Sequence, residues 1–182
     1  MIQPVIRQPV PNKKFVFPDY KAHLIFWTLA VTGLALDLLS KWAAFERLEE
    51  WEIFPVIDGF MQFIRALNVG AVWGSLSGKY YFLAAVSIIA MVVIIVIFFF
   101  SSRQPRIFHV ALGFLAAGIA GNPYDRIFND GLVRDFIDVY YKSFHWPTFN
   151  LADVWLCVGA GLLLISTFII EMLDRKHDRQ HK

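Results

Sequence analysis

Charged residues are scarce in this sequence, and cysteine is almost absent. Only 18% of the 182 residues are charged and 57% are hydrophobic, whereas soluble domains carry about 25% charged residues. The net charge of +2 is too small to indicate a nucleic-acid partner. The single cysteine, Cys157, lies in an apolar run, so a disulfide framework or cysteine-based zinc site is excluded and a core position is expected. The five histidines form no HExxH motif, and we predict no metal and no cofactor.

Long apolar segments predict an all-α membrane protein with four transmembrane helices. A helix crosses the bilayer with about 20 mostly apolar residues. The stretch from Tyr80 to Ser102 carries no charge, and the stretch from Ile107 to Tyr124 is rich in glycine and alanine, which permit close helix packing. We expect one domain over residues 1–182, with spans at about 22–44, 80–101, 107–123 and 151–171 and outer loops at 45–79 and 124–150.

The distribution of lysine and arginine predicts the orientation in the membrane. The N-terminal tail, the short connection between the second and third spans and the C-terminal tail are all basic. The two other loops contain most of the acidic residues. Because positively charged loops stay in the cytoplasm, both termini are expected inside and both long loops outside.

Each outer loop has a local pattern of its own. In the first loop, Asp58-Gly59 separates two apolar runs, which predicts a β-hairpin over residues 51–65, with Pro55 restricting its strand to an edge. In the second loop, Asn129-Asp130-Gly131 predicts a turn and residues 132–141 read as extended. Asn150 suits the N-cap of the fourth span, which places Asp153 at the third helical position.

Two aspartates, Asp135 and Asp153, are the candidate catalytic residues. Each lies where a polar loop meets a hydrophobic segment. Two facing carboxylates can share one proton, so that one takes a proton from an attacking water and the other donates to the peptide carbonyl. The positive end of the helix favours an ionised Asp153, which makes Asp135 the expected protonated partner. This chemistry is peptide hydrolysis without a metal or a covalent intermediate.

Every candidate residue also has a structural interpretation. Asp153 could serve only as a helix cap, and Asp135 could form an ion pair with Arg134 or Arg126. Asp37 and Lys41 are four residues apart, a spacing that suits an ion pair at the membrane interface.

The asparagines and one serine have structural interpretations as well. Asn68 could be a turn residue and Asn122 a cap at the end of the third span. Ser75 and Lys79 are spaced for a serine–lysine dyad, but the sequence around Ser75 matches no nucleophile motif, and we do not favour it.

Taken together, the motifs resemble lipoprotein signal peptidase, also called signal peptidase II. Five elements occur in the family's order: Asp37-Leu38-Leu39-Ser40-Lys41, Asn68-Val69-Gly70-Ala71, Gly118-Ile119-Ala120-Gly121-Asn122-Pro123-Tyr124-Asp125-Arg126, Val133-Arg134-Asp135-Phe136-Ile137 and Phe149-Asn150-Leu151-Ala152-Asp153. The chain departs from the family in two places. Arg134 stands where the family has valine, and the interval from Asp125 to Asp135 is one residue longer.

The resemblance implies an aspartic endopeptidase that cuts bacterial prolipoproteins just before a cysteine carrying diacylglycerol. It implies that Asp135 and Asp153 are catalytic and that the first outer loop forms a small extracytoplasmic β-cradle. Residues that would support or line the site are Asp37, Lys41, Asn68, Gly70, Asn122, Asp125, Arg126 and Asn150. The expected partners are lipidated prolipoproteins and membrane lipid, and the expected location is the bacterial inner membrane, with the protein acting as a monomer.

Two other classes of protein compete with this interpretation. A non-enzymatic four-helix protein could bind cations or a partner through its carboxylates. A phosphatidyl-transfer enzyme could hold magnesium on several aspartates spaced three or four residues apart and facing a phosphate, but in the second outer loop only Asp135 and Asp138 have that spacing.

Overall fold

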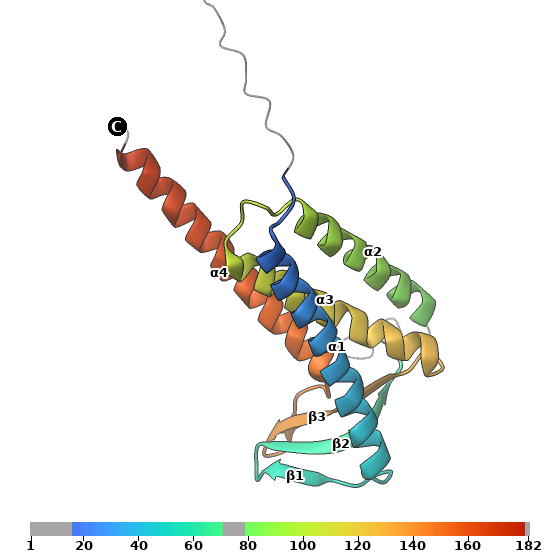
Figure 1. The fold of residues 1–182 in the computed structure, drawn as a ribbon. Coiled ribbons are helices and arrows are strands. Elements are labelled where there is room, and N and C mark those ends of the chain that lie inside the picture. The colour runs from blue at the N-terminus through green and yellow to red at the C-terminus, as the bar shows by residue number, and fades with distance from the viewer. Residues whose placement is uncertain (1–15, 71–78, 181–182) are drawn as a thin grey trace, which may run out of the picture.

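The chain forms a bundle of four helices with a small antiparallel sheet at one end (Figure 1). The structure is a computed structural model that describes residues 16–70 and 79–180. Its helices are α1 (Tyr20–Arg47), α2 (Tyr80–Phe99), α3 (Arg106–Phe128) and α4 (Leu151–Gln180). Its strands are β1 (Phe54–Ile57), β2 (Met61–Asn68), β3 (Val133–Tyr141) and β4 (Phe144–His145). All four helices are long and apolar enough to cross a membrane, which confirms the predicted fold class.

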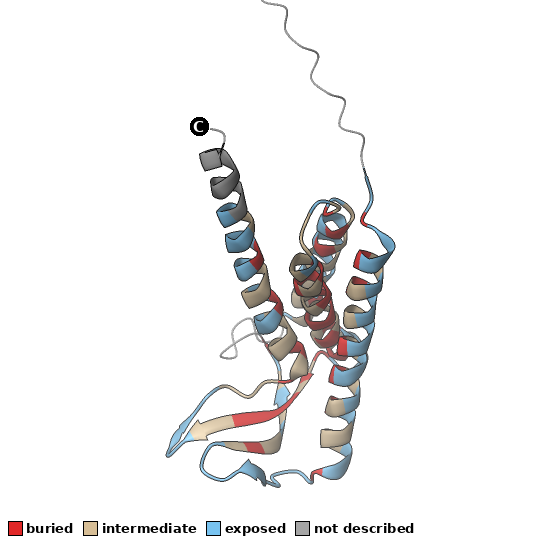
Figure 2. Cartoon of the chain, turned by 60° about the vertical axis from the view of Figure 1, so that its left-hand side comes forward, coloured by how far each residue is buried: buried red, intermediate tan, exposed pale blue. Residues whose placement is uncertain are grey.

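Helix α3 is the centre of the bundle. It packs against α1, α2 and α4, and Figure 2 shows that it is the most continuously buried helix. Two glycines permit this close packing. A Cβ atom at Gly113 would lie 2.8 Å from the Leu29 Cβ, and one at Gly118 would lie 2.9 Å from the Leu156 backbone nitrogen. The glycine-rich composition of this span therefore serves close helix approach, as expected.

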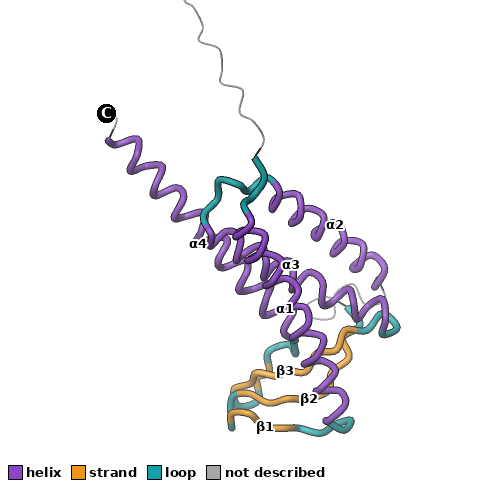
Figure 3. Tube along the Cα trace, viewed as in Figure 1, coloured by secondary structure: helices purple, strands orange, loops and turns teal. Residues whose placement is uncertain are grey.

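An apolar core lies at the end of the bundle away from the sheet. Phe26 of α1 and Phe98 of α2 stack with their ring centroids 4.2 Å apart, and Leu112 of α3 is fully buried beside them. The connection between α2 and α3 lies at this same end, and the first described residues and the C-terminus also extend from it (Figure 3). The sheet and the polar residues described below lie at the opposite end.

The sheet joins the two loops that were expected to lie outside the membrane. Its strand order is β1-β2-β3-β4, and all neighbouring strands are antiparallel. The predicted hairpin is confirmed: β1 pairs with β2, Gly59 has a φ of 75° in the turn between them, and Pro55 lies in the edge strand β1. The predicted turn at Asp130-Gly131 is also confirmed, since both residues have positive φ values.

The pairing of β2 with β3 was not predicted from the sequence. Asp135 lies opposite Ala66, and Val133 lies opposite Asn68. This register places the Asn68 side chain on the same face of the sheet as Asp135, because alternate residues of a strand share a face. The two loops therefore form one structure, and their pairing determines what lies beside the candidate aspartate.

Helix α3 does not stop at residue 123, where the third span was expected to end. It continues through Pro123 to Phe128, so the connection that follows it begins at Asn129. Proline removes one helical hydrogen bond, but side chains after Pro123 make compensating contacts: Asp125 binds Lys41 and Arg134, and Arg126 binds the Gly70 carbonyl. Tertiary contacts therefore outweigh the local signal.

Some sequence predictions fall outside the described residues. These are the basic N-terminal residues up to Phe15, Ala71 of the second motif, and Ser75 of the disfavoured serine–lysine dyad.

Candidate active site

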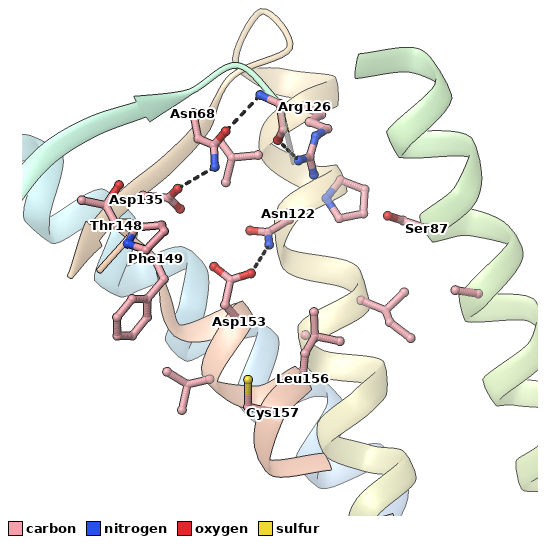
Figure 4. Close-up of a pocket in the computed structure, with 18 of the residues that line it drawn as sticks. Asn68, Ser87, Asn122, Arg126, Asp135, Thr148, Phe149, Asp153, Leu156 and Cys157 are labelled. Atoms are coloured by element: carbon pink, nitrogen blue, oxygen red, sulfur yellow. Dashed lines mark hydrogen bonds between the residues drawn. The ribbon is translucent and has the colours of Figure 1, made fainter. Parts of the chain in front are cut away.

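Asp135 lies on β3 with its carboxylate buried and held by two asparagines, of which Figure 4 shows Asn68. The Asn68 Nδ2 donates to Asp135 Oδ2 over 3.0 Å, and the Asn150 Nδ2 donates to Asp135 Oδ1 over 2.6 Å. The residue is only 2% exposed. Asp135 forms no ion pair with Arg134 or Arg126 among the described residues, so its structural interpretation as half of a salt bridge is wrong.

Asp153 lies in the first turn of α4, as predicted. Its Oδ2 accepts a hydrogen bond from the Asn150 backbone N–H over 3.2 Å, and the Asn150 Oδ1 accepts from the Asp153 N–H over 3.3 Å. This reciprocal pair is a helix capping box, and it confirms Asn150 as the N-cap. The other oxygen, Oδ1, accepts from the Asn122 Nδ2 over 2.9 Å, so Asp153 does more than cap its own helix.

Two asparagine side chains connect the aspartates. The Asn150 Nδ2 that donates to Asp135 also lies 2.9 Å from the Asn122 Oδ1, and the Asn122 Nδ2 donates to Asp153. Both carboxylates line one cavity of about 750 Å³, and Figure 4 shows them on facing sides of it. The arrangement brings together two carboxylates that are 18 residues apart in sequence and belong to different elements.

The environment of Asp135 changes its proton affinity. The pKa of Asp135 is raised to about 6, mainly by burial and also by the nearby charge of Asp153, while the hydrogen bonds from Asn68 and Asn150 act in the opposite direction. Burial dominates because removing an ionised carboxylate from water costs more than two amide hydrogen bonds return. The raised pKa agrees in direction with the expectation that Asp135 is the protonated partner.

A buried charge cluster lies behind the two aspartates. The Lys41 Nζ lies 2.8 Å from Asp37 Oδ2 and 3.4 Å from Asp125 Oδ2, and it donates to the Asn122 Oδ1 over 3.0 Å. All three ionic side chains have no exposed surface. The expected ion pair between Asp37 and Lys41 therefore exists, and it is buried between helices.

Asp37 also fixes the start of α4. Its Oδ1 accepts a hydrogen bond from the Ala152 backbone N–H over 2.8 Å, which satisfies one of the free donors at this helix end. A Cβ at position 121 would clash with the Asp37 carboxylate, so Gly121 makes room for it. The lysine that orients Asn122 and the carboxylate that anchors α4 thus belong to one cluster.

Arg126 and Gly70 connect the cluster to the first outer loop. The Arg126 guanidinium donates to the Gly70 carbonyl over 2.8 Å, and the Gly70 N–H donates to the Asn68 Oδ1 over 2.9 Å. Asn68 therefore both stabilises the local turn and donates a hydrogen bond to Asp135. Asn122 does not end α3, which continues for six more residues, so its interpretation as a helix cap is wrong.

All ten residues chosen from the sequence lie in one connected network. Hydrogen bonds and ion pairs join them without a break, and they are Asp37, Lys41, Asn68, Gly70, Asn122, Asp125, Arg126, Asp135, Asn150 and Asp153. They come from α1, β2, α3, β3 and α4 and from the connections between these elements. No single stretch of the sequence could form such a network.

The apolar part of the cavity was not predicted. Its lining comes from three helices and includes Val86, Ala90, Ile119, Leu156 and Val158. Cys157 lies among these residues and is exposed, so the prediction that it belongs to the core was wrong. An apolar run in a membrane protein gives no signal that separates a side chain facing a helix from one facing lipid or a cavity.

The geometry does not favour the magnesium-dependent alternative. Asp135 and Asp138 are three residues apart on β3, so their side chains point to opposite faces of the strand. Asp138 accepts a hydrogen bond from Gln62 over 2.7 Å and pairs with His145 at 2.9 Å, away from Asp135. Among residues 16–70 and 79–172, no group of three or more histidine, cysteine or acidic side chains is arranged to hold a metal ion.

Comparison with known proteins places this network in a family. The family model for signal peptidase (SPase) II matches residues 29–169, a range that includes all ten network residues. The chain belongs to the signal peptidase II family. It is accordingly a membrane protease of the type that removes signal peptides from lipoproteins.

Solved structures of similar proteins support the fold. One, described as a bacterial membrane enzyme at 2.3 Å resolution, has 30% sequence identity and a TM-score of 0.73, and the match covers 92% of this chain and 98% of that one. A second, described in the same words at 1.9 Å resolution, has 31% identity and a TM-score of 0.70, with coverage of 84% and 96%. The sheet and the four helices of this chain therefore have close counterparts.

Proposed function

We propose that the protein removes signal peptides from diacylglyceryl-modified bacterial prolipoproteins by aspartic peptidase chemistry, cutting just before the lipidated cysteine. One observation carries this proposal: Asp135 from β3 and Asp153 from α4 line the same cavity and are linked through Asn150 and Asn122. Two carboxylates with different surroundings suit a division into a proton donor and a proton acceptor.

In the proposed reaction, a water molecule between the carboxylates is the nucleophile. The ionised Asp153 takes a proton from this water as its oxygen bonds to the scissile carbonyl carbon. The protonated Asp135 donates a hydrogen bond to the carbonyl oxygen. The C–N bond then breaks, the leaving amine takes up a proton from the dyad, and the other product is a carboxylic acid. Because the pKa of Asp135 is raised to about 6, its protonated form persists much closer to neutral pH than that of an ordinary aspartate.

The asparagines keep the two carboxylates distinct. Asn122 uses its oxygen to accept from Lys41 and Asn150, so its amide nitrogen is directed at Asp153. Asn68 and Asn150 each donate to a different oxygen of Asp135. Fixed donors of this kind hold reacting groups in place without reorganisation during the reaction.

The cavity suits a substrate that is anchored in the membrane. Its polar end contains the two carboxylates, and its apolar lining continues between α2, α3 and α4. A lipidated cysteine is held at the membrane surface by its acyl chains, which would remain in contact with apolar side chains as the peptide bond reaches the dyad. Since those chains start in lipid, they gain little energy on binding, and recognition depends on placing the peptide bond at the right depth.

The charge distribution supports an active site near the outer face of the inner membrane. In the sequence, the N-terminal tail, the connection between α2 and α3 and the C-terminal tail are basic, and the connection between α2 and α3 lies at the end of the bundle away from the sheet. Basic ends face the cytoplasm, so we place both termini inside and the dyad outside. We further propose that the protein acts as a monomer.

Cleavage of matched precursors tests the proposed function. The purified protein is incubated with a diacylated prolipoprotein and with the same precursor lacking the lipid, and the products are identified by mass spectrometry. We expect cleavage of the lipidated precursor immediately before the modified cysteine, and cleavage by the Asp135→Asn and Asp153→Asn variants to fall by about a thousandfold or more. Activity should persist in a chelator.

An aspartate outside the network provides the matched control. Asp58 lies exposed in the turn between β1 and β2, and Asp58→Asn should retain full activity. Cleavage by both dyad variants at the wild-type rate would refute the aspartic mechanism. Equal cleavage of the unlipidated precursor would refute the proposed substrate.

A further inference from the structure

Arg134, the residue directly before Asp135, has a specific contact inside the network. Its Nη2 and Nε donate to Asp125 Oδ1 over 2.6 and 3.2 Å, and its backbone N–H donates to Asp125 Oδ2 over 3.0 Å. Asp125 is fully buried, whereas the Arg134 side chain is 20% exposed. Three hydrogen bonds therefore tie the start of β3 to the last turns of α3, one residue before the candidate catalytic aspartate.

Arg134 supplies a second cation in direct contact with the buried carboxylates of this region. Asp37 and Asp125 are two buried carboxylates, and Lys41 is the one ammonium group that contacts both. Its distance to Asp37 is 2.8 Å, but its distance to Asp125 is 3.4 Å. Arg134 supplies the second positive charge, at 2.6 Å from Asp125. Without it, Lys41 would be the one cation among the described residues in direct contact with these two buried carboxylates, and Arg126 would act on Asp125 only at longer range. Such a loss of a direct partner is strongly unfavourable.

The position of Lys41 matters for the second aspartate. Its Nζ donates to the Asn122 Oδ1 over 3.0 Å, and the Asn122 Nδ2 donates to Asp153 over 2.9 Å. A lysine drawn toward an uncompensated Asp125 would leave this oxygen, and the Asn122 amide would lose one of the two donors that fix its direction. Arg134 is thus connected to Asp135 through the backbone and to Asp153 through Asp125, Lys41 and Asn122.

We infer that Arg134 is a positioning residue for both aspartates, an inference that rests on the proposed function. Its hydrogen bonds to Asp125 fix the start of β3 against α3, and this sets the position of the Asp135 carboxylate in the cavity. It also neutralises Asp125, which keeps Lys41 on Asp37 and Asn122. Arg134 does not contact the substrate in this scheme.

Three variants separate the charge of Arg134 from its geometry. Arg134→Met removes the charge and the donors, Arg134→Lys keeps the charge but loses the two-pronged contact, and Arg134→Met with Asp125→Asn removes one positive and one negative charge together. Cleavage of the lipidated precursor is measured per folded enzyme as a function of pH. Arg134→Met should lower kcat by about tenfold or more with KM little changed.

A second readout does not depend on activity. The protonation of Asp135 is followed by the infrared band of its carboxyl group, with Asp135→Asn assigning the band. Asp135 faces Asp153 from α4, Lys41 from α1 and Arg126 from α3, so removal of one nearby cation should move its midpoint to higher pH. The double variant should return the midpoint toward the wild-type value. Arg134→Lys, which keeps the positive charge, should have a midpoint equal to that of the wild type.

Arg65 on β2 provides a matched arginine control. It is exposed and donates to the Leu48 carbonyl over 3.2 Å, outside the network, so Arg65→Met should change neither kcat nor the midpoint. The inference is overturned if Arg134→Met keeps the wild-type kcat and midpoint, or if the double variant retains the full shift. If the wild-type protein itself does not cleave the lipidated precursor, the proposed function fails, and the infrared midpoint alone then decides whether Arg134 controls Asp135.

Discussion

The two ends of the helix bundle are held together by different physics. At the end away from the sheet, Phe26, Phe98 and Leu112 pack as an apolar core, with the rings of His23 and His109 edge-on to Phe98. At the sheet end, buried ionic side chains, among them Asp37 and Lys41 of α1 and Asp125 of α3, fill the space between these two helices. Both regions are buried. The apolar core is built from side chains that need only a close fit, whereas each charge at the sheet end needs a partner of opposite charge.

This difference determines how each end tolerates change. Lipid is as apolar as leucine, so an apolar side chain gains little from leaving it, and the apolar core depends on close packing. A buried charge that loses its partner cannot be solvated by water instead, so removing one partner strongly lowers the stability of the fold. Helix α3 runs through both regions, which allows the comparison to be made within one element.

The largest predicted effect is at Lys41. Lys41→Met leaves the buried carboxylates of Asp37 and Asp125 with one cation fewer, so the free energy of unfolding should fall by about 3–5 kcal/mol. Unfolding in mixed micelles measures this change. Lys21→Met, at the exposed start of α1, is the control and should stay within about 0.5 kcal/mol of the wild type. Equal stability of the two variants would show that the charge cluster does not hold this end together.

The next effect is a pH dependence confined to the sheet end. Burial raises the pKa of Asp135 to about 6, whereas an aspartate in the unfolded chain titrates near about 3.9. The folded state therefore binds this proton more tightly, so the stability it contributes is fully present below pH ~3.9 and is lost as the pH rises through about 6. The shift corresponds to about 3 kcal/mol.

Comparison with Asp135→Asn isolates this contribution. The unfolding free energy of the wild type relative to Asp135→Asn should fall by about 2–3 kcal/mol between about pH 4 and pH 7.5. The same comparison made with Ile94→Ala, in the apolar core, should depend on pH far less, because no titratable side chain is replaced. A constant difference for Asp135→Asn would mean that burial does not control its ionisation.

The smallest predicted effect is in the apolar core. Phe98 has no exposed surface and stacks on Phe26, so Phe98→Ala removes packing contacts but little hydrophobic free energy. We expect a loss of about 1–3 kcal/mol, below the range for soluble cores, with unchanged cleavage per folded molecule. Phe82→Ala, on the exposed face of α2, is the control and should cost less. A loss of activity in folded Phe98→Ala would show that the two ends are not independent.

Local patterns in the sequence were enough to predict the elements of the fold. Four apolar segments, the turn at Asp58-Gly59 and the cap at Asn150 each depend on neighbouring residues only. The extension of α3 beyond Pro123 and the exposure of Cys157 were missed, because both depend on what lies across from those residues in space.

The sequence by itself determined which residues could form a polar site at a membrane boundary. Placing carboxylates and asparagines beside apolar helices costs free energy, so such residues are few and can be identified from the sequence. Only the tertiary structure decided how they are joined. The pairing of β2 with β3 brings Asn68 to Asp135, and the packing of α1 against α3 brings Lys41 to Asp125. These contacts link residues far apart in the chain, and a hydrogen bond depends on the distance and direction between two atoms, which sequence spacing does not specify.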